Sequence, residues 1–179
     1  SVSFTHKNTD ISVREKLSFS NIERKNEILR LISSSQNINE CMVLSTCNRV
    51  EIIASVKTVE GASKHIIACM SLICGIPFEE LQSRADIYED NGAVHHLFAV
   101  ASSLDSLVIG ETQIAGQLKE AYKFARANGK CGAKLGRAME FAFKCAAEVR
   151  NKTEISKNPI SVSSVAVAKA KEIFGTLNG

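Results

Sequence analysis

Two short apolar runs separated by a polar pentapeptide are the feature that most constrains this chain. The runs cover residues 41–44 and 50–56, and the pentapeptide covers residues 45–49. Runs rich in β-branched residues that are joined by four or five polar residues are typical of two strands with a tight connection. The sequence therefore predicts a β-hairpin with Cys47 at its tip.

Cys47 is a candidate nucleophile because of this position. A cysteine in a strand connection can be exposed, and Arg49 lies two residues away. Partial exposure beside a fixed positive charge favours the thiolate, which is the reactive form of cysteine. Free cysteines nevertheless serve more often as small apolar core residues. From the pentapeptide alone, both roles remain open for Cys47.

Composition narrows the class of protein. The chain has 179 residues, is 45% hydrophobic and 23% charged, and carries a net charge of +3. These values indicate a globular protein, and the mild positive charge permits nucleic-acid contact without requiring it. No segment approaches the ~18 apolar residues of a membrane span, and the N-terminus has no secretory pattern. The six cysteines contain no C-x-x-C pair, which favours a reduced cytoplasmic protein without a disulfide framework or a metal site.

The first half of the chain predicts a ferredoxin-like sheet. Strand and helix signals alternate in the order β-α-β-β-α-β, which is typical of an antiparallel sheet with two helices on one face. The first helix is expected to open with the capping-box pattern Ser20-Asn21-Ile22-Glu23, and the second to end at Gly75. Residues 5–12 are expected to form a loop. The predicted elements are a strand at 1–4, a helix at 22–33, the hairpin strands, a helix at 61–74, a one-turn helix at 77–81 and a strand at 85–89.

The second half predicts helices without further strands. Apolar residues recur at helical spacing over 94–101, 114–128, 135–149 and 160–174. The fold class is therefore α+β, with a sheet part at about 1–91 and a helical part at about 92–157 that packs against the sheet. Together these parts form one catalytic unit at 1–157. Residues 158–179 are expected to begin a long linker helix, as in a chain cut before a further domain.

A second polar cluster lies at the start of the helical part. Gln113 and Gln117 are four residues apart, so they share a helix face, which borders the loop with Asp105 and Ser106. Such a set could surround a small polar ligand. The alternative is purely structural, because Ser and Asp often cap helices and glutamine is usually solvated. His95 and His96 are adjacent on a helix, so at most one of them is expected to face a site.

Taken together, these segments resemble the N-terminal catalytic domain of glutamyl-tRNA reductases. The resemblance is carried by STCNRVE at 45–51, by HLF at 96–98, and by LDSLVIGETQI at 104–114 with Gln117. VREKLSF at 13–19 and VRNKTEI at 149–155 also fit, so nearly the whole chain is covered in the expected order. Ser103 departs from the family, which usually has glycine there. Residues 5–10 lack the family's proline-containing loop.

The resemblance implies an activity and a set of site residues. The family reduces glutamyl-tRNA to glutamate-1-semialdehyde through a cysteine thioester, using NADPH, in the first committed step of tetrapyrrole (5-aminolevulinate) synthesis. Cys47 would be the nucleophile and His96 a second catalytic residue that accepts or donates a proton. Arg49 would pair with the substrate's carboxylate and Glu111 with its α-ammonium group. The positions that would hold the glutamyl group are Thr46, Asn48, Arg49, Ser106, Glu111, Thr112, Gln113 and Gln117.

The resemblance also implies partners outside this chain. No G-x-G-x-x-G motif occurs among the ten glycines, so NADPH is expected to bind a domain that these residues do not contain. This chain alone would then hold the acyl-transfer half and would not reduce the ester. Expected partners are glutamyl-tRNA, a second subunit joined through a C-terminal dimerisation domain, and the aminomutase that takes the product.

Two alternatives remain open on sequence grounds. One is a thiol esterase that acts on another aminoacyl ester. The other is a non-catalytic RNA-binding module, because the RRM has the same β-α-β-β-α-β order and stacks bases on aromatic residues of its sheet. The strand at 50–56 contains no aromatic residue, which argues against the second alternative. Basic residues at 119–134 could contact tRNA or could simply form a solvated helix face.

Overall fold

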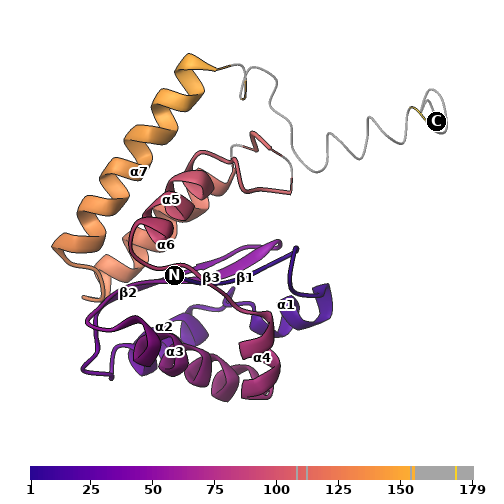
Figure 1. Ribbon diagram of the computed structural model, residues 1–179, viewed down its shortest axis with the longest axis vertical. Helices are drawn as coiled ribbons and strands as arrows, with labels where there is room; N and C mark the ends of the chain where they lie inside the picture. The colour runs from indigo at the N-terminus through magenta and orange to yellow at the C-terminus, as the bar shows by residue number, and fades with distance from the viewer. Residues whose placement is uncertain (108, 112, 154, 156–171, 173–179) are drawn as a thin grey trace.

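The computed structural model describes residues 1–107, 109–111, 113–153, 155 and 172. A four-stranded sheet lies between two layers of helices (Figure 1). The elements are β1 (Val2–Thr5), α1 (Ile11–Leu17), α2 (Ile22–Ile32), β2 (Ile38–Ser45), β3 (Arg49–Val56), α3 (Val59–Cys74), α4 (Phe78–Arg84), β4 (Asp86–Ile87), α5 (Asp90–Ala101), α6 (Gln113–Ala127) and α7 (Ala133–Lys152).

The sheet has the topology that the sequence predicted. Its strand order is β2-β3-β1-β4, and every pair of neighbours is antiparallel. The two strands that follow each other directly, β2 and β3, form the expected hairpin, with Val43 opposite Ile52 and Ser45 opposite Val50. This is the ferredoxin-like arrangement, so the α+β prediction is confirmed.

Both faces of the sheet are covered, which explains the apolar character of its central strands. In Figure 1, α2, α3 and α4 lie on one face and α5, α6 and α7 on the other. Successive side chains of a strand point to opposite faces, so Val50 and Ile52 face the first layer. Arg49, Glu51 and Ile53 face the second layer. All five residues are buried, as expected for a strand between two helical layers.

Several element ends differ from the sequence-based expectation. The residue that caps α2 is Asn21, whose Oδ1 accepts from the Glu23 N–H at 2.6 Å, so the capping-box prediction with Ser20 is one residue off. Gly75 closes α3 with φ 64°, as predicted. The loop expected over residues 5–12 instead contains the start of α1, a seven-residue helix whose single buried side chain is Leu17. Such a short helix has too few apolar positions to show a period.

The elements after residue 85 agree only in part with those predicted from the sequence. The strand predicted at 85–89 is reduced to the two residues of β4, which pair with β1. The helices predicted at 94–101, 114–128 and 135–149 correspond to α5, α6 and α7. The helix predicted at 160–174 falls outside the described residues, apart from position 172. Within the described part of the chain, no helix has the length and apolarity needed to cross a membrane.

Strand β2 is tied to the helical layer along its outer edge. The Cys41 N–H donates to the carbonyl of Lys130, just after α6, at 2.8 Å. The carboxylate of Glu40 accepts from three N–H groups at the start of α7: Gly132 at 2.9 Å, Lys134 at 3.0 Å and Leu135 at 2.8 Å. Burial acts to raise the pKa of Glu40, but these three hydrogen bonds and the charge of Lys134 hold it below its usual value.

This contact gives a stability prediction. Glu40→Gln should lower the free energy of unfolding at pH 7 by about 1–3 kcal/mol, because an amide has one acceptor oxygen and directs an NH₂ group at the other donors. The measurement is urea unfolding followed by circular dichroism. Glu27→Gln is the matched control on the exposed side of α2. It should change the free energy by no more than about 0.5 kcal/mol.

The same pair of variants tests the pH dependence. Because the pKa of Glu40 is lower in the folded than in the unfolded chain, its contribution is complete above the unfolded pKa of about 4.3. The contribution is lost as the pH falls through the folded pKa. The difference between wild type and Glu40→Gln should therefore shrink from pH 7 to pH 3, and a difference that stays constant would contradict this role.

Candidate active site around Cys47

The tip of the β2–β3 hairpin presents Cys47 to solvent. The turn is closed by Thr46, whose N–H donates to the Arg49 carbonyl at 2.9 Å. Thr46 Oγ1 also accepts from the N–H groups of Asn48 and Arg49, both at 3.2 Å. These bonds satisfy the backbone around the turn, so that Cys47 can remain exposed while the residues on either side are held.

Cys47 borders a narrow cleft to which both halves of the chain contribute. The cleft has a volume of about 20 Å³, close to the room needed by one water molecule. It is lined by Thr46, Cys47, Asn48 and Arg49 of the hairpin, by Ser106, Leu107 and Glu111 of the loop after α5, and by Gln113, Ile114 and Gln117 of α6. Eight of the ten predicted site residues therefore meet at one place. Of the other two, Thr112 lies outside the described residues, and His96 is not in the lining.

Arg49 links the hairpin to the loop that follows α5. Its Nη1 donates to Glu51 Oε1 at 2.5 Å, and its Nη2 donates to Asp105 Oδ2 at 3.1 Å and to the Asp105 carbonyl. The side chains of Arg49 and Glu51 are 3% and 1% exposed. A charged group removed from water in this way is stable only if its partners are well placed, so the contact fixes the position of the loop.

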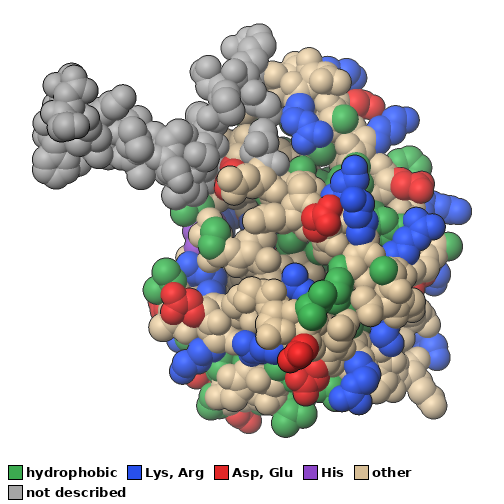
Figure 2. All heavy atoms as spheres, turned by 180° about the vertical axis from the view of Figure 1, so that it is seen from behind, with side chains coloured by type: hydrophobic (Ala, Val, Ile, Leu, Met, Phe, Trp, Pro, Cys, Tyr) green, Lys and Arg blue, Asp and Glu red, His purple; other side chains and the backbone are tan. Residues whose placement is uncertain are grey.

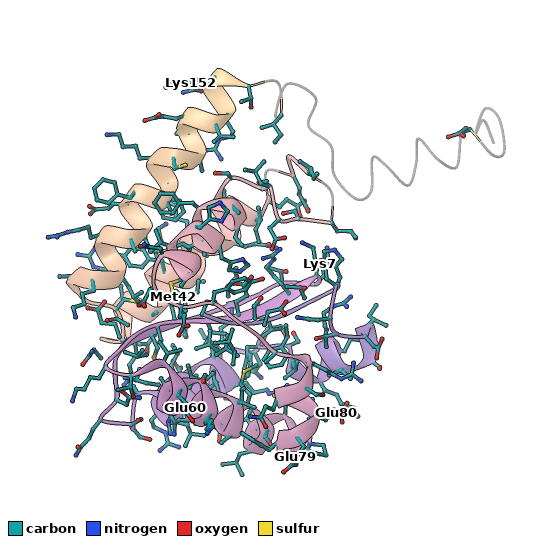
Figure 3. The ribbon with its side chains drawn as sticks, viewed as in Figure 1. Lys7, Met42, Glu60, Glu79, Glu80 and Lys152 are labelled. Carbon is teal, nitrogen blue, oxygen red and sulfur yellow. The ribbon has the colours of Figure 1, made fainter. Side chains whose placement is uncertain are left out.

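These contacts alter the role expected for Arg49. The sequence predicted that its guanidinium receives the substrate's carboxylate and supplies positive charge to Cys47. In the structure, two carboxylates already compensate that charge. Asp105 is further paired with Lys7, which Figure 3 shows at the end of the sheet beneath the loop after α5. A substrate carboxylate would have to displace Asp105 or bind beside it.

His96 lies behind Arg49, in the buried part of this network. Its Nε2 is 2.9 Å from Glu51 Oε2, and its Nδ1 is 3.9 Å from Asp105 Oδ2. The imidazole stacks on Tyr88, with ring centroids 4.0 Å apart and an angle of 7° between the planes. Among the described residues, no hydrogen bond joins His96 to Cys47. The position suits an effect on Arg49 and Glu51 more directly than proton transfer at the sulfur.

The charges of the network are held in place by mutual pairing. Burial acts to raise the pKa of Glu51, yet the hydrogen bond and charge of His96, together with Arg49, keep it below its usual value. Burial likewise opposes the charge of Asp105, whose pKa is lowered by the Lys7 hydrogen bond and by Arg49. Sequence reasoning did not select Glu51 or Tyr88. A glutamate inside an otherwise apolar strand was the available signal, because such residues are seldom fully buried unless paired.

Comparison with known proteins identifies the family. The profile described as "Glutamyl-tRNAGlu reductase, N-terminal domain" matches residues 2–153. The chain belongs to the glutamyl-tRNA reductase family. The relative from Campylobacter concisus is 68% identical over 178 residues, covering 99% of this chain and 42% of that protein. The relative from Campylobacter fetus is 67% identical over 179 residues, with the same 42% share of its length.

A solved structure extends this likeness to the fold. The glutamyl-tRNA reductase from Methanopyrus kandleri matches with a TM-score of 0.72 at 30% identity, covering 98% of this chain and 40% of that one. The chain thus spans about two fifths of the length of the relatives that it matches. The family resemblance expected from the sequence is confirmed for this N-terminal region.

Ser103, where the resemblance led us to expect glycine, has an unusual backbone conformation. Ser103 has φ 61°, a left-handed conformation that glycine adopts without cost. Its Oγ donates to the Glu111 carbonyl at 2.6 Å, and its own carbonyl accepts from the Gly110 N–H at 3.1 Å. The hydroxyl therefore closes the loop carrying Asp105 and Ser106, which offsets the strain of a side chain at this position.

Ser103 variants separate these two effects. Ser103→Ala keeps the left-handed strain and loses the hydrogen bond, so it should lower the free energy of unfolding by about 1 kcal/mol. Ser103→Gly loses the same bond but relieves the strain, so it should be more stable than the alanine variant by about 1 kcal/mol. Urea unfolding of both variants measures the difference. Equal stabilities would show that the backbone is not strained at this position.

The exposure of the cysteines predicts selective alkylation. Burial raises the pKa of the Cys41 thiol to about 11 and, with the charges of Cys41 and Glu40, that of Cys131 to about 12. Burial also raises the pKa values of Cys69 and Cys74. Among the six cysteines, all of which are in the described part of the chain, Cys47 is exposed and the others are buried or half-buried.

N-ethylmaleimide should therefore modify Cys47 first, at least about tenfold faster than Cys41 or Cys131. Peptide mapping by mass spectrometry during the reaction gives the order of modification. Cys47→Ser should remove the fast phase and leave the slower ones. Modification of Cys131 before Cys47 would show that the hairpin tip is not open in solution.

Proposed function

We propose that this chain is the acyl-transfer half of an NADPH-dependent glutamyl-tRNA reductase. The observation that carries the proposal is Cys47, exposed at a fixed hairpin tip and bordered by polar side chains of the hairpin, the loop after α5 and α6. Family membership supports the substrate class. The protein would act in the cytoplasm on glutamyl-tRNA, in tetrapyrrole synthesis.

The proposed chemistry is transfer of the glutamyl group from an ester to a thiol. The Cys47 thiolate attacks the ester carbonyl carbon, and a carbon–sulfur bond forms. The carbon–oxygen bond to the terminal ribose then breaks, and the ribose oxygen takes up a proton. The products are a glutamyl thioester on Cys47 and a tRNA with a free 3′ end. An aminoacyl ester is already activated, so no further energy source is needed.

The residues at the mouth of the cleft would contact the glutamyl group during this step, because the cleft itself has room for about one water molecule. Asn48, Ser106 and Gln113 offer hydrogen bonds, and Glu111 offers a carboxylate for the α-ammonium group. Arg49 would attract the side-chain carboxylate, which would bind beside Asp105 while the pair of Arg49 and Asp105 stays intact. Because His96 contacts Glu51 and Asp105, it would act on the acylation step by positioning Arg49.

The described residues do not form a dinucleotide-binding site for NADPH, the hydride donor. Dinucleotides bind where a glycine-rich turn joins a parallel strand to a helix, so that the pyrophosphate meets the helix N-terminus. The sheet here is antiparallel throughout its described strands, and the sequence has no such turn. We assign NADPH to a part of the protein outside this chain and assign no reduction step to these residues.

The two alternatives differ in how well they suit the structure. An RRM binds RNA on the open face of its sheet, whereas α5, α6 and α7 cover that face here (Figure 1). A thiol esterase for another aminoacyl ester would use the same cleft. Acylation rates with glutamyl-, glutaminyl- and aspartyl-tRNA distinguish it, since a reductase of this family should be acylated fastest by glutamyl-tRNA.

The nucleophile is tested directly by substitution. Cys47→Ser should reduce formation of the hydroxylamine-sensitive glutamyl-enzyme from radiolabelled glutamyl-tRNA to background, because an alcohol cannot form the thioester. Cys145→Ser on α7 is the matched control and should be acylated like wild type. Unchanged circular dichroism would show that both variants fold. A labelled thioester on the Cys47→Ser protein would refute the assignment.

A further inference from the structure

A larger groove opens beside the Cys47 cleft. It runs between the start of α2, the edge of β2 and the exposed side of α6, and its volume is about 870 Å³. We call it the α6 groove. Its lining residues are Ser20, Ile22, Lys25, Val43, Ser45, Gln113, Gly116, Gln117, Glu120, Ala121, Lys123 and Phe124.

The α6 groove adjoins the cleft. Gln113 and Gln117, one helical turn apart on α6, line both hollows. The other sizeable cavity among the described residues has a volume of about 270 Å³ and lies beside α3, α5 and α7. It shares no lining residue with the cleft. Of these two larger hollows, the α6 groove is therefore the one that shares a wall with the Cys47 cleft.

The groove offers the groups that bind a nucleotide. Phe124 is an aromatic surface at its wall, and Lys25 Nζ lies 5.8 Å from the ring centroid. The ammonium of Lys25 has no ion pair with a described acidic side chain, whereas Lys123 is 3.3 Å from Glu120. Proteins bind single-stranded nucleic acids by stacking bases on aromatic rings and pairing phosphates with cations. Figure 2 shows Lys and Arg side chains scattered among acidic ones. Nucleotide binding in the groove would therefore depend on the position of Lys25 more than on the net charge of the protein.

We propose that the α6 groove binds the 3′-terminal adenosine of the aminoacylated acceptor end. This inference rests on the proposed function, in which the ester carbonyl meets Cys47. The leaving oxygen of that ester belongs to the terminal ribose, so the nucleoside must lie directly outside the cleft. A groove of this volume is within the usual range for small-ligand sites, whereas the cleft of about 20 Å³ is far too small for a nucleoside.

Each group of the groove then has a defined task. Phe124 stacks on the adenine, and Lys25 moves from the ring to the phosphate that precedes the adenosine. Gln113 and Gln117 lie where the two hollows meet, at the level of the ribose. Acylation by a full-sized ester thus depends on the groove, whereas acylation by a glutamyl ester without a nucleoside does not.

The first test measures binding without catalysis. The trinucleotide CpCpA, titrated against the protein and followed by NMR, should bind wild type. Phe124→Leu should weaken its binding about 5- to 100-fold through loss of stacking. Lys25→Gln should reduce the slope of log affinity against log salt by about 0.7, the value for one contact to a single strand. Phe141→Leu on α7 is the control for Phe124→Leu and should bind like wild type.

Equal affinities in wild type, Phe124→Leu and Lys25→Gln would overturn the proposal, as would absence of CpCpA binding. Phe124 is partly buried and packs against the apolar core, so its variant could lose stability. Lys25 is half-buried but does not belong to that core, so Lys25→Gln gives an independent measurement.

The second test asks whether the adenosine is the one attached to the acyl group. A free adenylate has the same base and phosphate, so AMP is compared with the stable amide of glutamate and 3′-amino-3′-deoxyadenosine. The amide should protect Cys47 from N-ethylmaleimide, and Phe124→Leu should weaken this protection. AMP should not protect. Protection by neither compound, with tight AMP binding, would indicate a site for free adenylates and would overturn the proposal.

An error in the assignment of the α6 groove and an error in the proposed acyl transfer would give different experimental results. If Cys47 does not form a thioester with glutamyl-tRNA, acylation is absent in wild type, whatever the affinity for CpCpA. If only the groove assignment is wrong, wild type and Phe124→Leu are acylated at equal rates by glutamyl-tRNA and by glutamyl α-methyl ester. The proposal predicts a slower reaction of Phe124→Leu with glutamyl-tRNA alone.

Discussion

The buried guanidinium of Arg49 is the interaction on which the site depends. It lies between Glu51 on its own strand and Asp105 in the loop after α5, so one charged group connects residues that are far apart in the sequence. Removal of one partner from a buried ion pair leaves an uncompensated charge and is strongly unfavourable. The hairpin tip and the loop therefore keep a fixed relation, and the cleft between them is defined by electrostatics as much as by packing.

A sheet covered on both faces makes this arrangement possible. The layer formed by α2, α3 and α4 closes the core beneath β3, so the other face can hold polar residues at one end without loss of the apolar centre. Met42 lies between β2 and the upper helical layer in Figure 3, and it is fully buried. Towards the hairpin tip, the same face carries Arg49 and Glu51. The candidate site thus lies where the apolar interior ends.

Local patterns predicted much of this structure, and long-range pairing explains what they missed. The hairpin, the strand order and the end of α3 at Gly75 follow from residue types over a few positions. Cys47 and Arg49 were selected from the hairpin sequence, and Ser106, Gln113 and Gln117 from their spacing. The family resemblance added Thr46, Asn48 and Glu111, and the structure brings these eight residues together at the cleft. The pairing of Arg49 with Asp105 could not be predicted, because it depends on how α5 lies on the sheet. The short helix α1 was missed since Leu17 is its single buried residue.

Strand β2 lies at the edge of the sheet, and its eight-residue sequence INECMVLS is rich in apolar residues. Exposed strands of this kind can pair with other chains and begin aggregation. Here the Cys41 N–H is already bonded to Lys130, and Glu40 holds the start of α7 beside the same strand. The helical half of the chain thereby covers part of this edge and makes it less available for pairing with another strand. Because residues 130–135 are made after β2, this edge is covered only once the helical half has been synthesised and has docked.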